Sequence, residues 1–262
     1  MTEAFCVTIK FMKKDTSWGK VSDWYDLHLS EDDTYHAKVI LPNLLRLVGP
    51  KKGIKILDLA CGQGFFSAEF VKAGAEVFGV DIGAELIARA KEKIPGAKFF
   101  VSPAHKLSFI ADSSIDTVVC SLAIQNIENI SEVFREVKKK LKPEGKFILV
   151  LNHPAFRIPG ASAWGFDEMS GKQYRRIDSY LSESKHEIDM HPGAKDKKDI
   201  TVSFHRPLQV WFKTLGNAGF AVTRLEEWIS HRESEKGPRK TAEDTARKEF
   251  PLFLCVEVIP LP

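Results

Sequence analysis

This chain has few cysteines, no long apolar run and only a small net charge. The cysteines form no CxxC pair, which argues against a disulfide framework or a zinc knuckle; they are Cys6, Cys61, Cys120 and Cys255. No apolar run approaches the roughly 20 residues that cross a bilayer. The opening stretch, MTEAFCVTIKFMKKD, also lacks the apolar core of a signal peptide. We therefore expect a cytoplasmic protein without a membrane partner.

The charges nearly cancel. Lysine and arginine number 38 against 35 acidic residues, which leaves a formal net charge of +3. A domain dedicated to nucleic-acid binding usually carries a marked basic patch or stripe. The composition therefore disfavours nucleic acid as the partner.

A metal site is also not expected. The segment HEIDMH places His186 and His191 five residues apart. The zinc motif of metalloproteases needs histidines four apart, on one face of a helix. The spacing here predicts no metal ligation.

Between residues 54 and 151, short apolar runs alternate with segments of helical periodicity. The expected helices cover about 65–73, 84–93 and 131–141, the last capped by Ser131. This alternation is typical of a parallel sheet with helices on both faces, so we predict a Rossmann-like, doubly wound α/β fold. The expected strands are Ile54–Asp58, Glu76–Val80, Ala97–Val101, Ile115–Ser121 and Lys146–Leu151.

Residues 152–206 interrupt this alternation with aromatics, prolines, glycines and four of the eight histidines. Irregular segments of this length inside a domain are usually functional, so we expect a substrate-binding lid. A helix beginning at Pro207 and strands over 220–228 and 252–259 follow, with a charged stretch over 231–249 between the strands. The predicted organisation is an N-terminal cap region (1–53), a binding core (54–151), the lid insert (152–206) and the rest of the core (207–262).

The stretch ILDLACGQGFFSAEF, residues 56–70, joins a strand to a helix through a glycine turn. Gly62 and Gly64 match the dinucleotide fingerprint G-x-G-x-x-G, but its third position is Ser67. Asp58 ends the strand, where a carboxylate would repel a pyrophosphate and attract a cation. S-adenosyl-L-methionine carries an ammonium group and no phosphate, so we predict it as the cofactor.

Asp81 ends the next strand, where a carboxylate can accept both ribose hydroxyls. A nicotinamide oxidoreductase is the alternative.

Four segments in order resemble the motifs of class I S-adenosylmethionine-dependent methyltransferases, in their small-molecule (type 11-like) branch. They are ILDLACGQG, GVDIGAELI, VSPAHKLSFIADSSIDTVVCSLAIQNI and LKPEGKFILV. The resemblance implies a seven-stranded sheet of order 3-2-1-4-5-7-6 with the last strand antiparallel. It also implies a helical N-terminal cap over the cofactor.

Position by position, the resemblance assigns residues to the parts of the cofactor. Family members often carry an acid before alanine after the third strand. Here the pair is Pro103-Ala104, so His105 or backbone groups would have to contact the adenine amino group. The implied contacts are Asp58, Ala60, Gly62 and Gly64 at the methionine end, Tyr25 and Tyr35 as its cover, Asp81 and Ile82 at the ribose, Ala104 and His105 at the adenine, and Ser121 at the sulfonium.

Transfer of a methyl group to an oxygen or nitrogen acceptor can also require a base near neutral pKa. His153 follows the fifth strand and His205 precedes the helix at Pro207, so both are candidate bases. Tyr174, Arg175 and Arg206 are candidate substrate contacts, because arginines can hold a carboxylate or phosphate. The predicted function is methyl transfer to a small molecule. An RNA (tRNA) methyltransferase and a non-catalytic cofactor-binding subunit are the alternatives.

Overall fold

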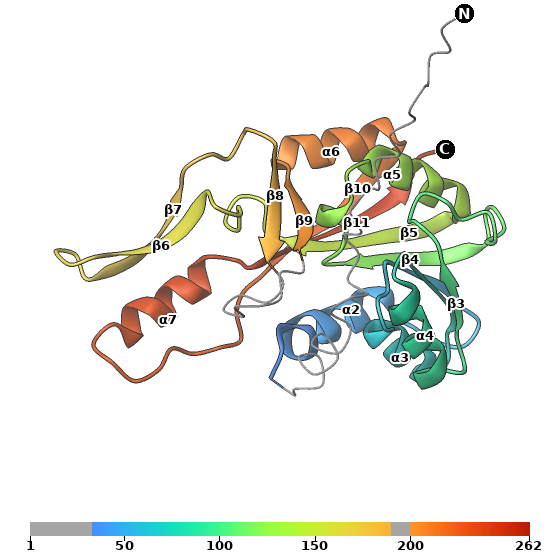
Figure 1. Ribbon diagram of the computed structural model, residues 1–262, viewed down its shortest axis with the longest axis horizontal. Helices are drawn as coiled ribbons and strands as arrows, with labels where there is room; N and C mark the ends of the chain where they lie inside the picture. Colours follow the sequence, from blue (N-terminus) through green and yellow to red (C-terminus); the bar gives the residue numbers. More distant parts are fainter. Residues whose placement is uncertain (1–32, 190–199) are drawn as a thin grey trace, which may run out of the picture.

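The computed structural model describes residues 33–189 and 200–262. Its centre is a seven-stranded sheet of order β10-β11-β5-β4-β1-β2-β3 (Figure 1). β11 runs antiparallel to both β5 and β10, whereas β1 to β5 pair in parallel. This topology confirms the predicted fold class. The strands are β1 (Lys55–Leu59), β2 (Glu76–Asp81), β3 (Lys98–Val101), β4 (Ile115–Ser121), β5 (Leu141–Asn152), β10 (Phe220–Trp228) and β11 (Phe253–Pro260).

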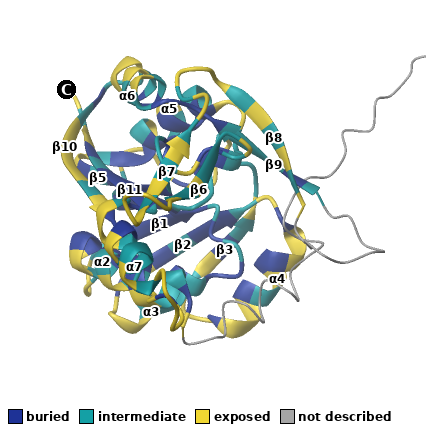
Figure 2. Cartoon of the chain, turned by 90° about the vertical axis from the view of Figure 1, so that its left-hand side faces the viewer, coloured by how far each residue is buried: buried dark blue, intermediate teal, exposed yellow. Residues whose placement is uncertain are grey.

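Helices cover both faces of the sheet, which explains why its central strands are apolar on both sides. In β1, Ile56 packs in the core under α2 and α3, while Leu57 packs in the core under α5 and α6. The central strands are accordingly buried between the helical layers (Figure 2). The helices are η2 (His36–Ile40), α2 (Leu41–Val48), α3 (Phe65–Lys72), α4 (Ala84–Lys93), η3 (Ile124–Asn126), α5 (Ile130–Lys140), α6 (Leu208–Asn217) and α7 (Lys240–Glu249).

Two local expectations about α5 and β5 were wrong. The cap of α5 is Asn129, whose Oδ1 accepts a hydrogen bond from the backbone N–H of Glu132 at 3.4 Å. β5 begins at Leu141, before the expected Lys146, because Leu141 pairs with Ile115 ahead of a register shift.

The insert contains regular structure that the sequence did not predict. It forms two antiparallel ribbons, β6 (Ser162–Asp167) with β7 (Lys172–Ile177), and β8 (Ser184–Asp189) with β9 (Ile200–His205). The β6–β7 ribbon projects from the core as an arm, and α7 lies beside it (Figure 1). Arg239, before α7, pairs with Glu168 at the tip of this arm. The charged stretch over 231–249 is therefore partly helical, and it supports the arm. The domain boundaries themselves stay predictions.

Within the described ranges, no helix is long and apolar enough to cross a membrane.

Candidate functional site

A cavity of about 1140 Å³ lies at the carboxyl ends of β1, β2 and β4. Asp58, Asp81 and Ser121, which end or nearly end these strands, all line it. Ligands bind at this edge in open α/β sheets, because the loops that follow the strands converge there. The strands thus gather residues that lie far apart in the sequence.

The turn after β1 has a backbone that only small residues adopt easily. Ala60 and Gly62 have positive φ angles of 58° and 57°. At Gly64, φ is +84°, and an added Cβ would lie 2.5 Å from Cδ1 of Ile94. Gly64 does not line the cavity itself, but its missing side chain lets the start of α3 lie close to Ile94 and to Phe99 of β3.

Asp58 is almost fully buried, with 2% of its surface exposed, at the base of the cavity. Its Oδ2 accepts a 2.6 Å hydrogen bond from the hydroxyl of Ser67. Burial raises the pKa of the Asp58 carboxyl to about 6, against the lowering effect of that bond. Because no cation in the described part of the chain pairs with it, a ligand cation beside Asp58 would favour its charged form.

Asp81 joins two turns at the same edge. Its Oδ2 accepts a hydrogen bond from the N–H of Gly62 at 2.9 Å, and its Oδ1 accepts one from the N–H of Gly83 at 2.8 Å. Each carboxylate oxygen can accept a further bond, so ribose hydroxyls can still bind there. Burial raises the pKa of Asp81 as well. The neighbouring Ile82 is 61% exposed at the cavity, an apolar surface that a nucleoside can cover.

Two buried oxygens on the cavity wall have no hydrogen-bond partner among the described residues. They are Oγ of Ser121 and Oε1 of Gln125. Buried polar atoms normally find a partner, so these two point to a polar or positively charged group of a ligand. Together with Asp58 they fit the ammonium and sulfonium of S-adenosylmethionine.

The other predicted cofactor residues divide into three groups. Ala104 and His105, expected at the adenine, line the same cavity. Tyr35 lines a second cavity instead, where its hydroxyl lies 3.3 Å from Oγ of Ser230. Tyr25 lies outside the described residues. The individual roles of all these residues stay predictions.

Cys61, inside the turn, is not suited to be a nucleophile. Burial and the nearby carboxylates of Asp58 and Asp81 raise the pKa of its thiol well above the usual range. A reactive cysteine needs the opposite environment, one that favours the thiolate.

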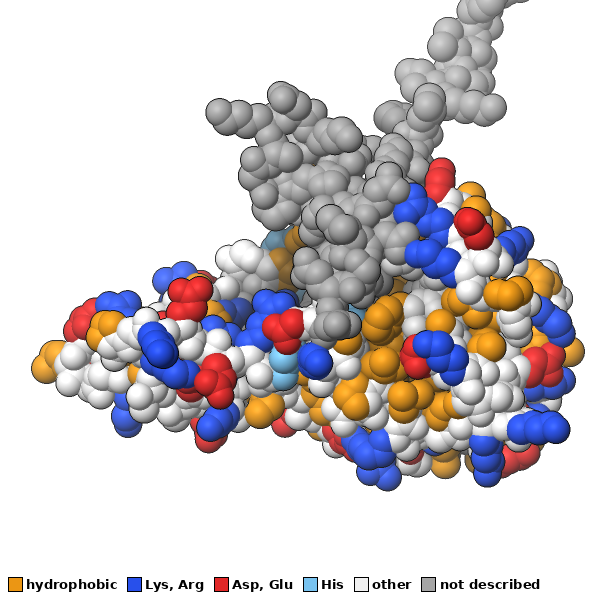
Figure 3. Space-filling view, turned by 90° about the horizontal axis from the view of Figure 1, so that it is seen from below, with side chains coloured by type: hydrophobic (Ala, Val, Ile, Leu, Met, Phe, Trp, Pro, Cys, Tyr) orange, Lys and Arg blue, Asp and Glu red, His pale blue; other side chains and the backbone are white. Residues whose placement is uncertain are grey.

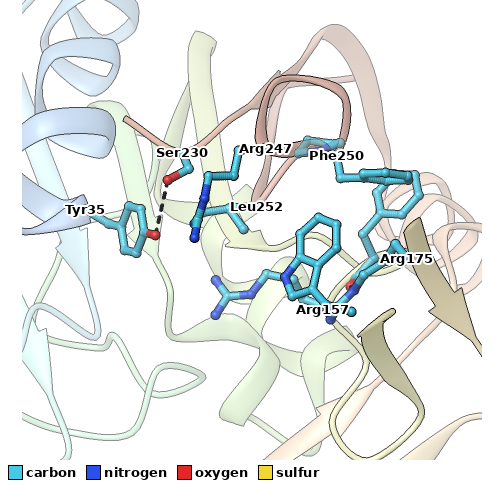
Figure 4. Close-up of a pocket in the computed structure, with 10 residues that line it drawn as sticks. Tyr35, Arg157, Arg175, Ser230, Arg247, Phe250 and Leu252 are labelled. Atoms are coloured by element: carbon cyan, nitrogen blue, oxygen red, sulfur yellow. Dashed lines mark hydrogen bonds between the residues drawn. The ribbon is translucent and has the colours of Figure 1, made fainter. Parts of the chain in front are cut away.

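The second cavity, of about 250 Å³, adjoins the first between the core, the β6–β7 arm and α7 (Figure 4). Arg157 and Arg175 line both cavities, so the two spaces share a wall. The lining residues are Tyr35, Phe156, Arg157, Trp164, Arg175, Ser230, Arg247, Phe250, Pro251 and Leu252.

The two candidate bases do not line either cavity. Nε2 of His153 lies 2.7 Å from Oε1 of Glu227, and its Nδ1 accepts the N–H of Ala155 at 3.2 Å. Burial lowers the pKa of His153. Nε2 of His205 donates to the carbonyl of Tyr180 at 2.7 Å. Both contacts are typical of structural histidines, and the catalytic roles stay predictions.

The three predicted substrate contacts lie in different surroundings. Arg175 faces both cavities, whereas Tyr174 is 46% exposed on β7 and lines neither. Arg206 is buried, and its Nη2 donates to the carbonyls of Ile127 and Glu128 at 3.0 and 2.6 Å. Since both of those residues line the larger cavity, Arg206 fixes its wall from behind.

Sequence reasoning did not select Gln125, Arg157 or Arg247 as site residues. Gln125 follows the fourth strand, a position that could have identified it. Arg157 and Arg247 lie 90 residues apart, in the insert and in a charged stretch, and no local pattern connects them.

Comparison with known proteins agrees with this geometry. Residues 57–149 match the family model described as a methyltransferase domain. The fold resembles an S-adenosylmethionine-dependent methyltransferase from Mesorhizobium loti, with 27% identity and a TM-score of 0.67 over 87% of this chain and 99% of that one.

Two curated relatives extend the comparison. An uncharacterized protein of Haemophilus influenzae is 25% identical over 71% of this chain and 74% of its own length. A demethylmenaquinone methyltransferase of Chlorobaculum parvum is 33% identical over 43% of this chain. The match spans only 47% of that enzyme's length, about half of it.

The fold is that of class I S-adenosylmethionine-dependent methyltransferases. Residues 57–149 form a methyltransferase domain, and S-adenosylmethionine is the cofactor of this chain.

Proposed function

We propose that this chain transfers the methyl group of S-adenosylmethionine to an oxygen or nitrogen of a small molecule. The observation that carries the proposal is the large cavity that begins at Asp58 and Asp81 and extends to the insert. Its volume of about 1140 Å³ is above the range of roughly 300–1,000 Å³ that suits one ligand. The cofactor and an acceptor can therefore lie in it together.

The cofactor supplies a methyl group on a positively charged sulfur, which is already a good leaving group. The protein then has to align the acceptor atom, the methyl carbon and the sulfur. Ser121 and Gln125 hold polar oxygens on the cavity wall, and the insert supplies Ile158, Ser162 and Arg175 to the lining of the same cavity. Residues from both the core and the insert would thus position the acceptor.

The charge distribution supports a small acceptor over RNA. On the face in Figure 3, acidic side chains are interspersed with lysines and arginines along the projecting arm. Arg176 of β7 pairs with Asp178, and Arg239, before α7, pairs with Glu168. A surface that binds phosphates along a nucleic acid needs unpaired positive charge instead.

Transfer of an isotope-labelled methyl group tests the proposal. Labelled S-adenosylmethionine is incubated with the protein and either a small-metabolite extract or bulk tRNA, with Asp58→Asn as the inactive control. We expect label in the small-metabolite fraction only. Label in tRNA alone would favour the RNA methyltransferase. Cofactor binding without transfer to either would favour a non-catalytic subunit, and binding of NADH in its place would contradict the cofactor assignment.

A further inference from the structure

Three arginines converge on the smaller cavity from segments far apart in the sequence. Arg157 follows β5, Arg175 belongs to β7 and Arg247 belongs to α7. Figure 4 shows that Arg157 and Arg247 extend into the space beside Tyr35. None of the three pairs with a carboxylate from the described portions of the chain. As far as the described residues go, the cavity thus carries concentrated positive charge without a counter-charge.

Neutral oxygens orient these guanidinium groups without balancing their charge. A guanidinium has five N–H donors, and each arginine uses only one or two of them on described protein atoms. The bonds are Arg157 Nη1 to Asn152 Oδ1 at 2.7 Å, Arg175 Nε to Phe156 O and Nη2 to Ser162 Oγ, both at 2.7 Å, and Arg247 Nε to Ser234 Oγ at 3.1 Å.

Packing around Arg157 and Arg175 disfavours their uncompensated charge, although Arg157 still has a solvent-exposed surface. Burial, and the positive charge of Arg175, lower the pKa of Arg157. Burial lowers the pKa of Arg175 too. An anion bound between them would relieve both effects through charge-assisted hydrogen bonds, and arginine suits the planar oxygens of carboxylates and phosphates.

The walls of the cavity are aromatic. The rings of Trp164 and Phe250 meet edge to face, with their centroids 5.4 Å apart. The ring centroids of Phe156 and Phe250 are 5.6 Å apart. Arg175 lies over the Trp164 ring at 5.2 Å. A volume of about 250 Å³ suits one part of a ligand, such as a ring with its acidic group.

We propose that the methyl acceptor is an anionic small molecule with an aromatic or apolar body. Its carboxylate or phosphate is held by Arg157, Arg175 and Arg247, and its body lies against Phe156, Trp164 and Phe250. Because Arg157 and Arg175 also line the larger cavity, the acceptor atom reaches the cofactor from this anchor. This inference rests on the proposed function and specifies its substrate class.

Calorimetry with simple probes tests the anchor. The protein is saturated with S-adenosylhomocysteine and titrated with benzoate, phenyl phosphate, inorganic phosphate and the neutral benzyl alcohol. We expect an aromatic anion to bind at least about tenfold more tightly than benzyl alcohol, as charge-assisted bonds imply. A preference for benzoate identifies a carboxylate, and a preference for the phosphates identifies a phosphate.

Single substitutions show whether these arginines are responsible. Arg157→Met and Arg247→Met should each weaken anion binding by roughly tenfold or more. Arg176→Met is the matched control, because Arg176 is exposed on the same strand as Arg175 and pairs with Asp178 at 3.0 Å. Binding of S-adenosylhomocysteine by each variant shows that it is folded.

Two results would overturn the inference. One is that benzyl alcohol binds as well as the anions, or that no anion binds below about 10 mM. The other is that the two variants bind anions as the control does. If S-adenosylhomocysteine does not bind the unaltered protein, the proposed function fails instead, so the two failures are distinguishable.

Discussion

The hydroxyl of Ser67 donates a 2.6 Å hydrogen bond to Oδ2 of Asp58, across the turn between β1 and α3. Ser67 occupies the position where the dinucleotide fingerprint has its third glycine. The serine hydroxyl orients a buried carboxylate toward the cavity. A glycine at this position could make no such bond and would only allow close packing. This pair therefore distinguishes the turn from a pyrophosphate-binding loop.

Asp58→Asn should weaken binding of S-adenosylmethionine by more than about tenfold, because the amide keeps the shape but loses the charge facing the ammonium. Asp58→Ala should have at least this effect. Isothermal calorimetry measures both. The control is Asp178→Asn, on the surface of the insert and outside both cavities. Unchanged affinity in the Asp58 variants would refute the ammonium contact.

Cofactor binding should depend on pH because the pKa of Asp58 is about 6 in the free protein. The ligand cation favours the charged carboxylate, so affinity should be highest above pH 6 and fall up to about tenfold per pH unit below it. Asp81, whose pKa is also raised, adds to this trend. Calorimetry from pH 5 to 8 measures it, and a dependence unchanged in Asp58→Asn would contradict the assignment.

The raised pKa of Asp58 also affects the free energy of unfolding, which should fall with rising pH while cofactor affinity rises. The folded protein binds more protons than the unfolded chain between about pH 4 and 6, since the Asp58 pKa is raised on folding. The free energy of unfolding should therefore fall over this range as pH rises, by up to about 3 kcal/mol from this group. Denaturant titrations of the wild type and Asp58→Asn should converge at the acidic end of the range. A constant difference between them would contradict this account.

Asp81→Ala should also weaken cofactor binding by about tenfold, since its carboxylate is expected to accept the ribose hydroxyls. An analogue without the ribose 2′-hydroxyl provides the specific test. The wild type should lose affinity for the analogue, whereas Asp81→Ala should bind both ligands alike, because the interaction is already absent. Equal losses in the two proteins would remove the ribose role.

The predicted bases are tested by His153→Ala and His205→Ala. If either histidine acts in proton transfer, its loss should reduce kcat by about 10²-fold or more and leave the Kd of the cofactor nearly unchanged. Steady-state kinetics on the identified acceptor, with calorimetry of cofactor binding, separates the two quantities. Normal turnover of both variants, with a lowered Tm, would assign the histidines to the hydrogen bonds with Glu227 and Tyr180 alone.

The strand–turn–helix sequence alone determined much of the cavity edge where the cofactor is expected to bind. Asp58, Gly62 and Gly64 lie within seven consecutive residues, and Asp81 ends the next strand. Their relation is local, because a glycine turn after a buried strand fixes where each group faces. The apolar runs likewise determined the parallel core of the sheet, because strands buried on both faces must be apolar throughout.

Only the tertiary structure decided how the second cavity is built. Arg157, Arg175 and Arg247 come from a loop, a ribbon and a helix, and their sequence neighbourhoods give no sign that they meet. The β6–β7 ribbon escaped the sequence analysis because its side chains are all exposed or half-buried, so the sequence has no buried apolar run there. Positions such as these are set by packing between distant segments. Local spacing can therefore specify a turn, but it cannot specify a cavity formed by three parts of the chain.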